Sequence, residues 1–449
     1  MAIAQSRQLA LEVLLRVAGG ASANAALDEA LSHANLDPRD RGFVTELVDG
    51  TLRWQGRLDY QLAQLVEEPL AKLDPAVLHI LRLGAYQLTR LERVPAHAAV
   101  NEAVEQARKR AHEGAAKLVN AVLRRLEREK DALLFPDLAD DPVAYLSAAY
   151  SHPAWLVERW LARFGLQETE ALLVINNTPP PLTLRMNRRW VTREGLQAFL
   201  KLREIETIPT AISPNGLIVT SGGNPRQVDL YDEGLYSLQG EGSMVMVELL
   251  KPGRHRAGWD MAAGVGGKTT YLAEWVDDTG SLLATDTSVD RLSVLWRELE
   301  RLELSSVRVE AGDARTFSVE AESMDYVLLD APCSGTGALR RQADARWRKT
   351  PEQLVEMAAL QRELLEAAAR AAKPGGLLLY CTCSLEPEEN EEVMSLFLAD
   401  HPEWSLDVEG ITHKSLPSDA RDLAGYVRLL PQRHGTDGFF AARLKKAGA

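Results

Sequence analysis

Apolar residues recur three or four positions apart through the first part of the chain, the spacing of helices that each bury one face. This pattern predicts helices over residues 3–18 and 75–91, and one or two more within 40–65. A further pair is expected over residues 95–128, with a break near Gly114. We therefore expect an all-α domain at the amino-terminal end.

Helical spacing resumes after residues 135–142, which are polar and acidic and indicate a linker. The prolines at 179–181 end this next helix, because proline lacks an amide donor and clashes with the preceding turn. Short strands with one helix, residues 193–202, follow up to about Tyr231. This mixture is typical of a small α+β module.

From about residue 234 the pattern changes to short apolar runs separated by helical segments. Strands are predicted at residues 259–262, 281–286, 307–310, 326–330 and 376–382. Helices between strands that succeed one another in this way predict a doubly wound α/β sheet. The tail from Asp437 to Leu444 has the pattern of a closing strand.

A length of 449 residues is too great for one ordinary core, so we expect three domains: 1–140, 141–233 and 234–449. Three cysteines are too few for a disulfide framework, and no apolar run approaches the ~20 residues that span a bilayer. We expect a cytoplasmic monomer that binds neither membrane nor metal. The net charge of −13 argues against a general nucleic-acid coat but leaves room for a local basic surface.

All three cysteines lie at the ends of two predicted strands. Cys333 follows the run that ends at Asp330, and Cys383 follows the run that ends at Thr382. Open α/β sheets present reactive groups at the carboxyl ends of their strands. Two thiols at such ends indicate thiol chemistry at a bound ligand. Cys381 should face the same way as Cys383 and either lies near the site or fills space below it.

A glycine-rich turn joins the first strand of the sheet to its helix. It consists of Ala262, Ala263, Gly264, Val265, Gly266, Gly267 and Lys268. Glycines let the backbone approach a ligand, and the helix amino terminus offers unpaired N–H groups. Asp286 and Asp330 end two of the next three strands, and Asp313 follows the strand between them. Asp286 stands where a carboxylate commonly binds ribose hydroxyls. Together these strand ends predict a nucleoside ligand.

Basic residues gather in two places. One is the helical face opposite the apolar positions of residues 117–128, with Lys117, Arg124 and Arg128. The other follows the first cysteine motif and surrounds Trp347, with Arg340, Arg341 and Arg346. Each is either a solvated surface or a set of contacts to RNA, in which cations bind phosphates and the aromatic ring stacks on a base.

The segment Asp330 to Gly337, with Thr382-Cys383-Ser384, resembles the paired cysteine motifs of the Sun-type (RsmB-like) bacterial 16S rRNA 5-methylcytosine methyltransferases. Residues 39–41, 58–59 and 117–125 resemble the NusB-like helical domain fused to the bacterial enzymes. Residues 184–187 resemble the start of the family's RNA-binding module, which implies that Arg185 contacts RNA. The resemblance covers almost the whole chain.

The resemblance implies a class I (Rossmann-like) domain that uses S-adenosylmethionine to methylate C5 of a cytosine in small-subunit ribosomal RNA. It implies that Cys383 is the nucleophile and that Cys333 helps to release the product, while Asp330 is placed to stabilise the activated ring. The glycine-rich turn, Asp286, Asp313 and Asp330 would hold S-adenosylmethionine. The turn departs from the family at Gly264-Val265, where Ala-Pro is usual, so a more flexible loop and weaker cofactor binding are expected.

Two other interpretations compete with this one. A DNA cytosine methyltransferase also uses a Pro-Cys pair, although the second thiol and the helical domain argue against it. A non-catalytic RNA-binding or assembly factor would use the altered turn as an inactive cofactor site. Methyl transfer to RNA, compared with binding alone, separates the three.

Overall fold

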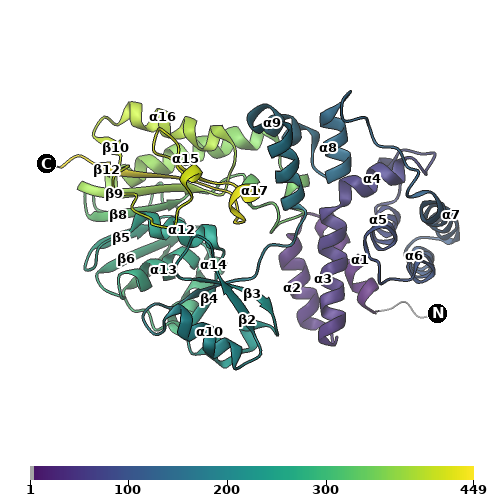
Figure 1. Ribbon diagram of the computed structural model, residues 1–449, viewed down its shortest axis with the longest axis horizontal. Coiled ribbons are helices and arrows are strands. Elements are labelled where there is room, and N and C mark those ends of the chain that lie inside the picture. Colours follow the sequence, from purple (N-terminus) through teal and green to yellow (C-terminus); the bar gives the residue numbers. More distant parts are fainter. Residues whose placement is uncertain (1–4, 449) are drawn as a thin grey trace. The chain divides into compact units, whose positions relative to one another are not determined.

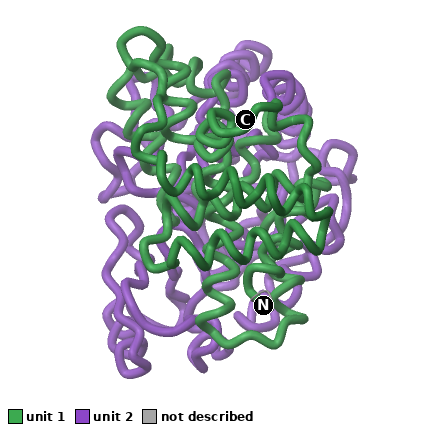
Figure 2. The backbone as a smooth tube through the Cα atoms, turned by 90° about the vertical axis from the view of Figure 1, so that its right-hand side faces the viewer, with its two compact units in different colours: residues 1–179, 339–349 green, residues 180–338, 350–449 purple. Residues whose placement is uncertain are grey.

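The structure is a computed structural model that describes residues 5–448, so Ile3 and Ala4 of the first predicted helix lie outside the described residues. The chain forms two compact units, coloured separately in Figure 2. The first contains residues 1–179 and 339–349, and the second contains residues 180–338 and 350–449. The division into domains at residues 140 and 233 remains our proposal.

Helices make up the first unit (Figure 1). They are α1 (Gln5–Ala18), α2 (Ala23–His33), α3 (Pro38–Arg53), α4 (Gln55–Ala63), α5 (Pro75–Arg90), α6 (Ala96–Arg110), α7 (Glu113–Glu129), α8 (Pro142–Tyr150) and α9 (Ala154–Asn176). Side chains of Asp37 and Asp74 accept amide hydrogen bonds at the starts of α3 and α5, each followed by a proline at the first helical position. The predicted all-α region is confirmed. Of the one or two helices expected within 40–65, the structure has two, which meet at Trp54.

An eleven-residue segment that follows the Cys333 motif in sequence belongs to this helical unit. Arg346, in the short 3-10 helix η4 (Ala345–Trp347), is fully buried and donates hydrogen bonds to four oxygens. These are the carbonyl oxygens of Arg53, Ser151 and Asn176 and the side-chain oxygen of Asn177, at 2.8–3.3 Å. A buried cation with this set of partners is a structural anchor.

The second unit begins with a four-stranded antiparallel sheet of order β2-β3-β1-β4, flanked by α10 (Arg193–Lys201). Its strands are β1 (Thr183–Met186), β2 (Glu206–Pro209), β3 (Gly216–Ser221) and β4 (Tyr236–Leu238). Leu184, Leu196, Leu217 and Tyr236 are among the buried residues of its own small core. The predicted α+β module is confirmed.

The larger sheet has the order β10-β12-β9-β8-β5-β6-β7, with β11 paired to β12. Its strands are β5 (Ala257–Asp260), β6 (Ser281–Asp286), β7 (Val307–Ala311), β8 (Met324–Asp330), β9 (Ala372–Thr382), β10 (Trp404–Leu406), β11 (Val427–Leu429) and β12 (Phe439–Lys446). Strands β5 to β9 pair in parallel, whereas β12, the predicted closing strand, runs antiparallel to β9. The α/β prediction is confirmed, with a mixed sheet.

Helices cover both faces of this sheet (Figure 1). One face packs on α12 (Glu241–Leu250), α13 (Gly267–Trp275) and α14 (Val289–Arg301), and the other on α15 (Pro351–Ala371) and α16 (Glu391–Asp400). Side chains of β8 alternate between the two cores, with Leu328 on the first face and Leu329 on the second. Strand order reverses between β5 and β8, and the crevice at such a switch point is where open α/β sheets bind ligands.

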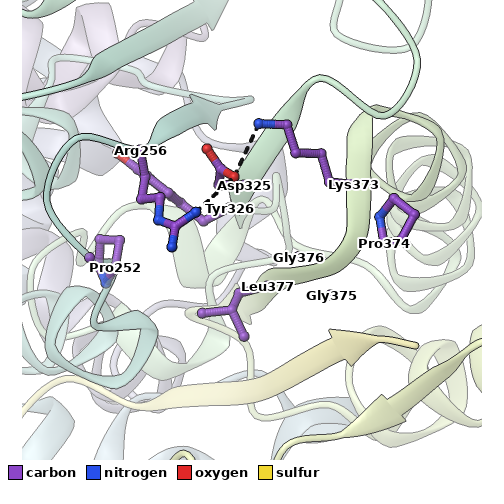
Figure 3. Close-up of a pocket in the computed structure, with 10 residues that line it drawn as sticks. Pro252, Arg256, Asp325, Tyr326, Lys373, Pro374, Gly375, Gly376 and Leu377 are labelled. Atoms are coloured by element: carbon purple, nitrogen blue, oxygen red, sulfur yellow. Dashed lines mark hydrogen bonds and ion pairs between the residues drawn. The ribbon is translucent and has the colours of Figure 1, made fainter. Parts of the chain in front are cut away.

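A cavity of about 290 Å³ lies at the opposite, amino-terminal edge of β5, β8 and β9 (Figure 3). Asp325 lines this cavity and forms ion pairs with Lys373 at 3.1 Å and with Arg256 at 3.5 Å. None of its lining residues is a predicted site residue. Between residues 5 and 448, no helix is long and apolar enough to cross a membrane.

Replacing Arg346 with alanine should lower the free energy of unfolding by about 2–4 kcal/mol, because several buried oxygens lose their donor. Chemical denaturation of the full-length protein, followed by circular dichroism, measures this. Arg128→Ala is the control in the same unit, since its side chain is 67% exposed and pairs only loosely with Glu129; it should change stability by less than about 0.5 kcal/mol. Equal effects of the two substitutions would contradict the anchoring role.

Candidate active site

The parallel pairing of β8 with β9 brings the two cysteine motifs together. Asp330 lies opposite Cys381 in the register, so the turns that follow the two strands leave the sheet side by side. The sulfur atoms of Cys333 and Cys383 are 3.4 Å apart, within hydrogen-bonding distance. A backbone hydrogen bond of 2.9 Å from Gly337 to Cys383 also links the two turns. The structure thus places both predicted catalytic thiols in one site.

The surroundings of Cys333 change the pKa of its thiol. A hydrogen bond to Cys383 raises the pKa of the Cys333 thiol well above its ordinary value, and burial and the charge of Cys383 add to the effect. The protonated form of Cys333 is therefore favoured. A thiolate is the nucleophilic form of cysteine, so this environment disfavours Cys333 as the attacking group.

Cys381 is fully buried among the apolar side chains of one sheet face and supports the site from below. Its thiol lies 3.5 Å from Asp330 and donates to that carboxylate. Burial and the charge of Asp330 raise the pKa of Cys381 well above its ordinary value. A protonated, enclosed thiol fits packing rather than catalysis.

Lys268 and Asp330 connect the glycine-rich turn to the end of β8. The ammonium of Lys268 lies 2.6 Å from the Asp330 carboxylate and 5.2 Å from the centre of the Phe439 ring. Burial lowers the pKa of Lys268. The negative charge of Asp330 and the neighbouring sulfurs of Cys381 and Cys383 raise it by more than burial lowers it, so the net shift is upward. A permanent positive charge therefore stands between the turn and the thiols.

Glycine is required at two positions of the turn. Gly264 and Gly266 have φ angles of 56° and 90°, and a Cβ atom at Gly266 would lie 2.3 Å from the side chain of Leu295. Asp286, buried at the end of β6, accepts hydrogen bonds from the amides of Gly264 (2.9 Å) and Ser288 (2.8 Å). These contacts hold the turn in place without the proline that is usual in the family.

The turn fits a nucleoside cofactor. A Cβ atom built on Gly264 would meet no atom within 4 Å, so this side of the turn is open. Helix α13 begins at Gly267, and its first N–H groups have no partner within the helix. Ala262, Ala263 and Val265 lie in the same turn, with the Val265 side chain about half exposed.

Asp313, the third predicted carboxylate, follows β7 and already has a partner. It forms an ion pair with Arg315 at 2.6 Å, and this hydrogen-bonded cation lowers the pKa of Asp313. Arg315 in turn binds Glu363 at 2.6 Å. Binding of a cofactor amine by Asp313 therefore stays a proposal that requires sharing this carboxylate with Arg315.

Burial corrects the RNA contacts predicted for three arginines. The guanidinium of Arg185 is fully buried and binds Glu274 at 2.6 Å and the carbonyl oxygen of Gly267 at 2.8 Å, so it joins the small module to the helix after the turn. Arg346 is the anchor described above, and Arg340 is buried and donates to the carbonyl oxygen of Pro179. Side chains sequestered in this way do not meet RNA phosphates.

The remaining predicted RNA contacts lie at the surface of the helical unit. Arg341 is exposed in the segment that contains η4. Lys117, Arg124 and Arg128 lie on α7, where Arg124 pairs with Glu127 at 3.2 Å and the other two cations are exposed. Their role in RNA binding remains a proposal.

Two buried carboxylates near the site were missed by sequence reasoning. Asp260 ends β5 and accepts a 2.6 Å hydrogen bond from Thr269, while burial raises its pKa to about 7. Its position before the glycine-rich turn was a usable signal. Glu389 follows Cys383 by six residues and contacts both cysteine turns, although it stands in a run of acidic residues that is typical of a solvated loop.

Three protein families match successive parts of the chain. Residues 247–445 match the family described as 16S rRNA methyltransferase RsmB/F, and residues 4–128 match the NusB family. Residues 152–225 match the ferredoxin-like domain of RsmF/B-like methyltransferases. Similarity to named relatives extends over nearly the full length: a probable ribosomal RNA small subunit methyltransferase B from Bacillus subtilis is 34% identical, covering 98% of this chain and 99% of its own.

The chain belongs to the RsmB/F family of 16S rRNA methyltransferases. It is accordingly an enzyme of the S-adenosylmethionine-dependent type. Another relative, a probable ribosomal RNA small subunit methyltransferase B from Synechocystis, is 37% identical, covering 98% of this chain and 99% of its own.

Solved structures agree with this assignment. The crystal structure of PH0851 superimposes with a TM-score of 0.82 at 28% identity, covering 99% of this chain and all of that one. A methyltransferase homologue from Pyrococcus horikoshii superimposes with a TM-score of 0.59 at 26% identity, covering 68% of this chain and 99% of its own. Within the described part of the RsmB/F chain, no group of three or more His, Cys, Asp or Glu side chains is arranged to hold a metal ion.

Removing Cys383 should lower the pKa of Cys333, because its hydrogen-bond partner and a neighbouring charge disappear. Thiolate is the form that reacts with iodoacetamide, so the pH midpoint for alkylation of Cys333 should fall in Cys383→Ala. Mass spectrometry of the Cys333 peptide across a pH series measures the midpoint. An unchanged midpoint would show that the two thiols are not coupled.

Proposed function

We propose that this enzyme methylates C5 of a cytosine in small-subunit ribosomal RNA through a covalent bond between Cys383 and C6 of the base. The observation that carries the proposal is the thiol pair, 3.4 Å apart, beside the Lys268–Asp330 ion pair at the switch point of the sheet. The names of the Bacillus subtilis and Synechocystis relatives support ribosomal RNA of the small subunit as the substrate.

The chemistry requires a nucleophile because C5 of cytosine does not accept a methyl group unaided. Addition of the Cys383 thiolate at C6 gives the ring enamine character, so that C5 becomes nucleophilic. S-adenosylmethionine, bound at the glycine-rich turn, supplies an electrophilic methyl group. The adduct must then lose the C5 proton and release the thiolate of Cys383.

The remaining groups of the site suit the other steps. Asp330 is placed to hydrogen-bond the activated ring near N3, with its charge balanced by Lys268 at 2.6 Å. Cys333 lies next to the Cys383 sulfur, which must leave C6 of the base, and assists this elimination. Asp286, which holds the turn through Gly264, is our proposed ribose contact, since a carboxylate can accept further hydrogen bonds.

RNA binding is assigned to surfaces outside the thiol site. The exposed cations of α7 and Arg341 are the proposed phosphate contacts of the helical unit. Because the substrate is ribosomal RNA, we propose that the enzyme acts in the cytoplasm, and a monomer satisfies every step above.

Single substitutions of Cys383 and Cys333 should block different steps of the reaction. Cys383→Ala forms no adduct and should be inactive. Cys333→Ala should still attack and methylate, yet release the RNA slowly, and so accumulate a protein–RNA species that survives a denaturing gel. The assay combines labelled methyl transfer with gel electrophoresis, using small-subunit ribosomal RNA.

The third cysteine provides the control for this experiment. Cys381→Ala should keep most of the activity, because the thiol is buried and only packs beneath the site. A trapped adduct in Cys383→Ala and none in Cys333→Ala would assign the nucleophile to Cys333, as in DNA cytosine methyltransferases.

Replacing Lys117, Arg124 and Arg128 together with alanine should weaken RNA binding and flatten its dependence on salt, since fewer counterions are released. Binding of S-adenosylmethionine should not change. Filter binding at a series of salt concentrations gives the slope. A slope equal to that of the wild type would show that this face of α7 is only solvated.

A further inference from the structure

Glu389 is fully buried in the turn between β9 and α16, in the 3-10 helix η5 (Pro387–Glu389). Its carboxylate accepts hydrogen bonds from the hydroxyl groups of Ser334 and Ser384. It also accepts the backbone amide of Ser334 at 2.7 Å. Ser334 directly follows Cys333, and Ser384 directly follows Cys383, so one carboxylate ties together the residues next to both thiols.

We propose that Glu389 is the positioning residue that sets the separation of the two catalytic sulfurs. The proposal rests on the proposed function only for what the thiols are used to do. A reaction in which one sulfur adds to a base and the other assists its departure requires both at fixed places around the same ring. Small displacements of reacting groups are costly to such steps.

Neighbouring side chains hold the Glu389 carboxylate in one position between the two cysteine turns. The hydroxyl oxygens of Ser334 and Ser384 lie 3.1 Å apart and share one carboxylate oxygen. Gln361 of α15 donates both to Glu389 at 3.2 Å and to the carbonyl oxygen of Pro332 at 2.9 Å. The carboxylate is therefore fixed to a helix on one side and to both cysteine turns on the other.

The hydrogen bonds of Glu389 predict which substitutions of this residue are tolerated. Alanine at 389 leaves two serine hydroxyls and one backbone amide buried without their acceptor. Glutamine keeps one acceptor oxygen for the Ser334 amide, and its NH2 group can donate to the two hydroxyl oxygens, which rotate to accept. The geometry rather than the charge is the requirement, so Glu389→Gln should rescue what Glu389→Ala loses.

Oxidation of the thiol pair measures the separation without RNA or S-adenosylmethionine. Diamide takes two electrons and two protons from a pair of thiols, which become a disulfide, and is itself reduced to the hydrazine. Its rate on the full-length protein reports how often the sulfurs of Cys333 and Cys383 meet. Quenching with a maleimide, followed by mapping of the linked peptides, separates this disulfide from any that involves Cys381.

Glu389→Ala should form the Cys333–Cys383 disulfide about tenfold or more slowly than the wild type, whereas Glu389→Gln should stay within about twofold. Methyl transfer should follow the same order. A folded Glu389→Ala protein that oxidises at the wild-type rate would overturn the proposal, as would a glutamine variant as slow as the alanine variant.

Glu248→Ala is the matched control for a general loss of stability. Glu248 is also a buried carboxylate of the same unit and accepts 2.6 Å hydrogen bonds from Ser213 and Tyr271, but it contacts neither cysteine turn. Its removal should leave the disulfide rate within about twofold of the wild type. A comparable slowing in Glu248→Ala would reduce Glu389 to a contributor to stability and overturn the proposal.

Two further variants cover the case in which Glu389→Ala does not fold. Ser384→Ala removes the hydroxyl through which its cysteine turn is bonded to the carboxylate, and Ser334→Ala leaves its turn bonded through the backbone amide alone. Both should slow disulfide formation. Wild-type rates in both would overturn the proposal. Because oxidation requires no substrate, a normal pattern of disulfide rates in a protein that fails to methylate RNA would count against the proposed function and not against the positioning role.

Discussion

The parallel pairing of β8 with β9 is the constraint on which the site depends. Hydrogen bonds between these strands fix Asp330 opposite Cys381. The thiols of Cys333 and Cys383, which we propose to be catalytic, each follow within three residues of this pair. A shift of register by one residue would turn every side chain of a strand to the other face. It would separate the sulfurs and move the carboxylate that pairs with Lys268.

At this edge of the sheet, the buried charges lie next to charges of opposite sign. Lys268 faces Asp330 and lies near the sulfurs of Cys381 and Cys383, so negative charge on Cys383, the proposed nucleophile, has a cation close by. Arg185 supports the same turn from the neighbouring module through Gly267 and Glu274. The small module therefore stabilises the glycine-rich turn through a buried arginine.

The sequence predicted the parts of the site that depend on local pattern. Cys333, Cys383 and Asp330 follow short apolar runs, and the ends of parallel strands gather at one edge, so their meeting could be anticipated. The burial of Arg185 and Arg346 could not be predicted. Neither a motif that resembles an RNA-binding module nor a basic segment shows whether an arginine side chain is surrounded by water or by buried oxygen atoms. Glu389 was hidden for a similar reason, since an acidic run gives no sign of which carboxylate turns inward.

The nucleophile is the centre of this account, and RNA that contains 5-fluorocytidine tests it directly. Fluorine at C5 cannot leave as a proton does, so the adduct that forms after methyl transfer should persist on the wild-type enzyme. Digestion and mass spectrometry then identify the cysteine that is joined to the base. The account predicts attachment to Cys383, whereas attachment to Cys333, or to neither thiol in a protein that still methylates RNA, would contradict it.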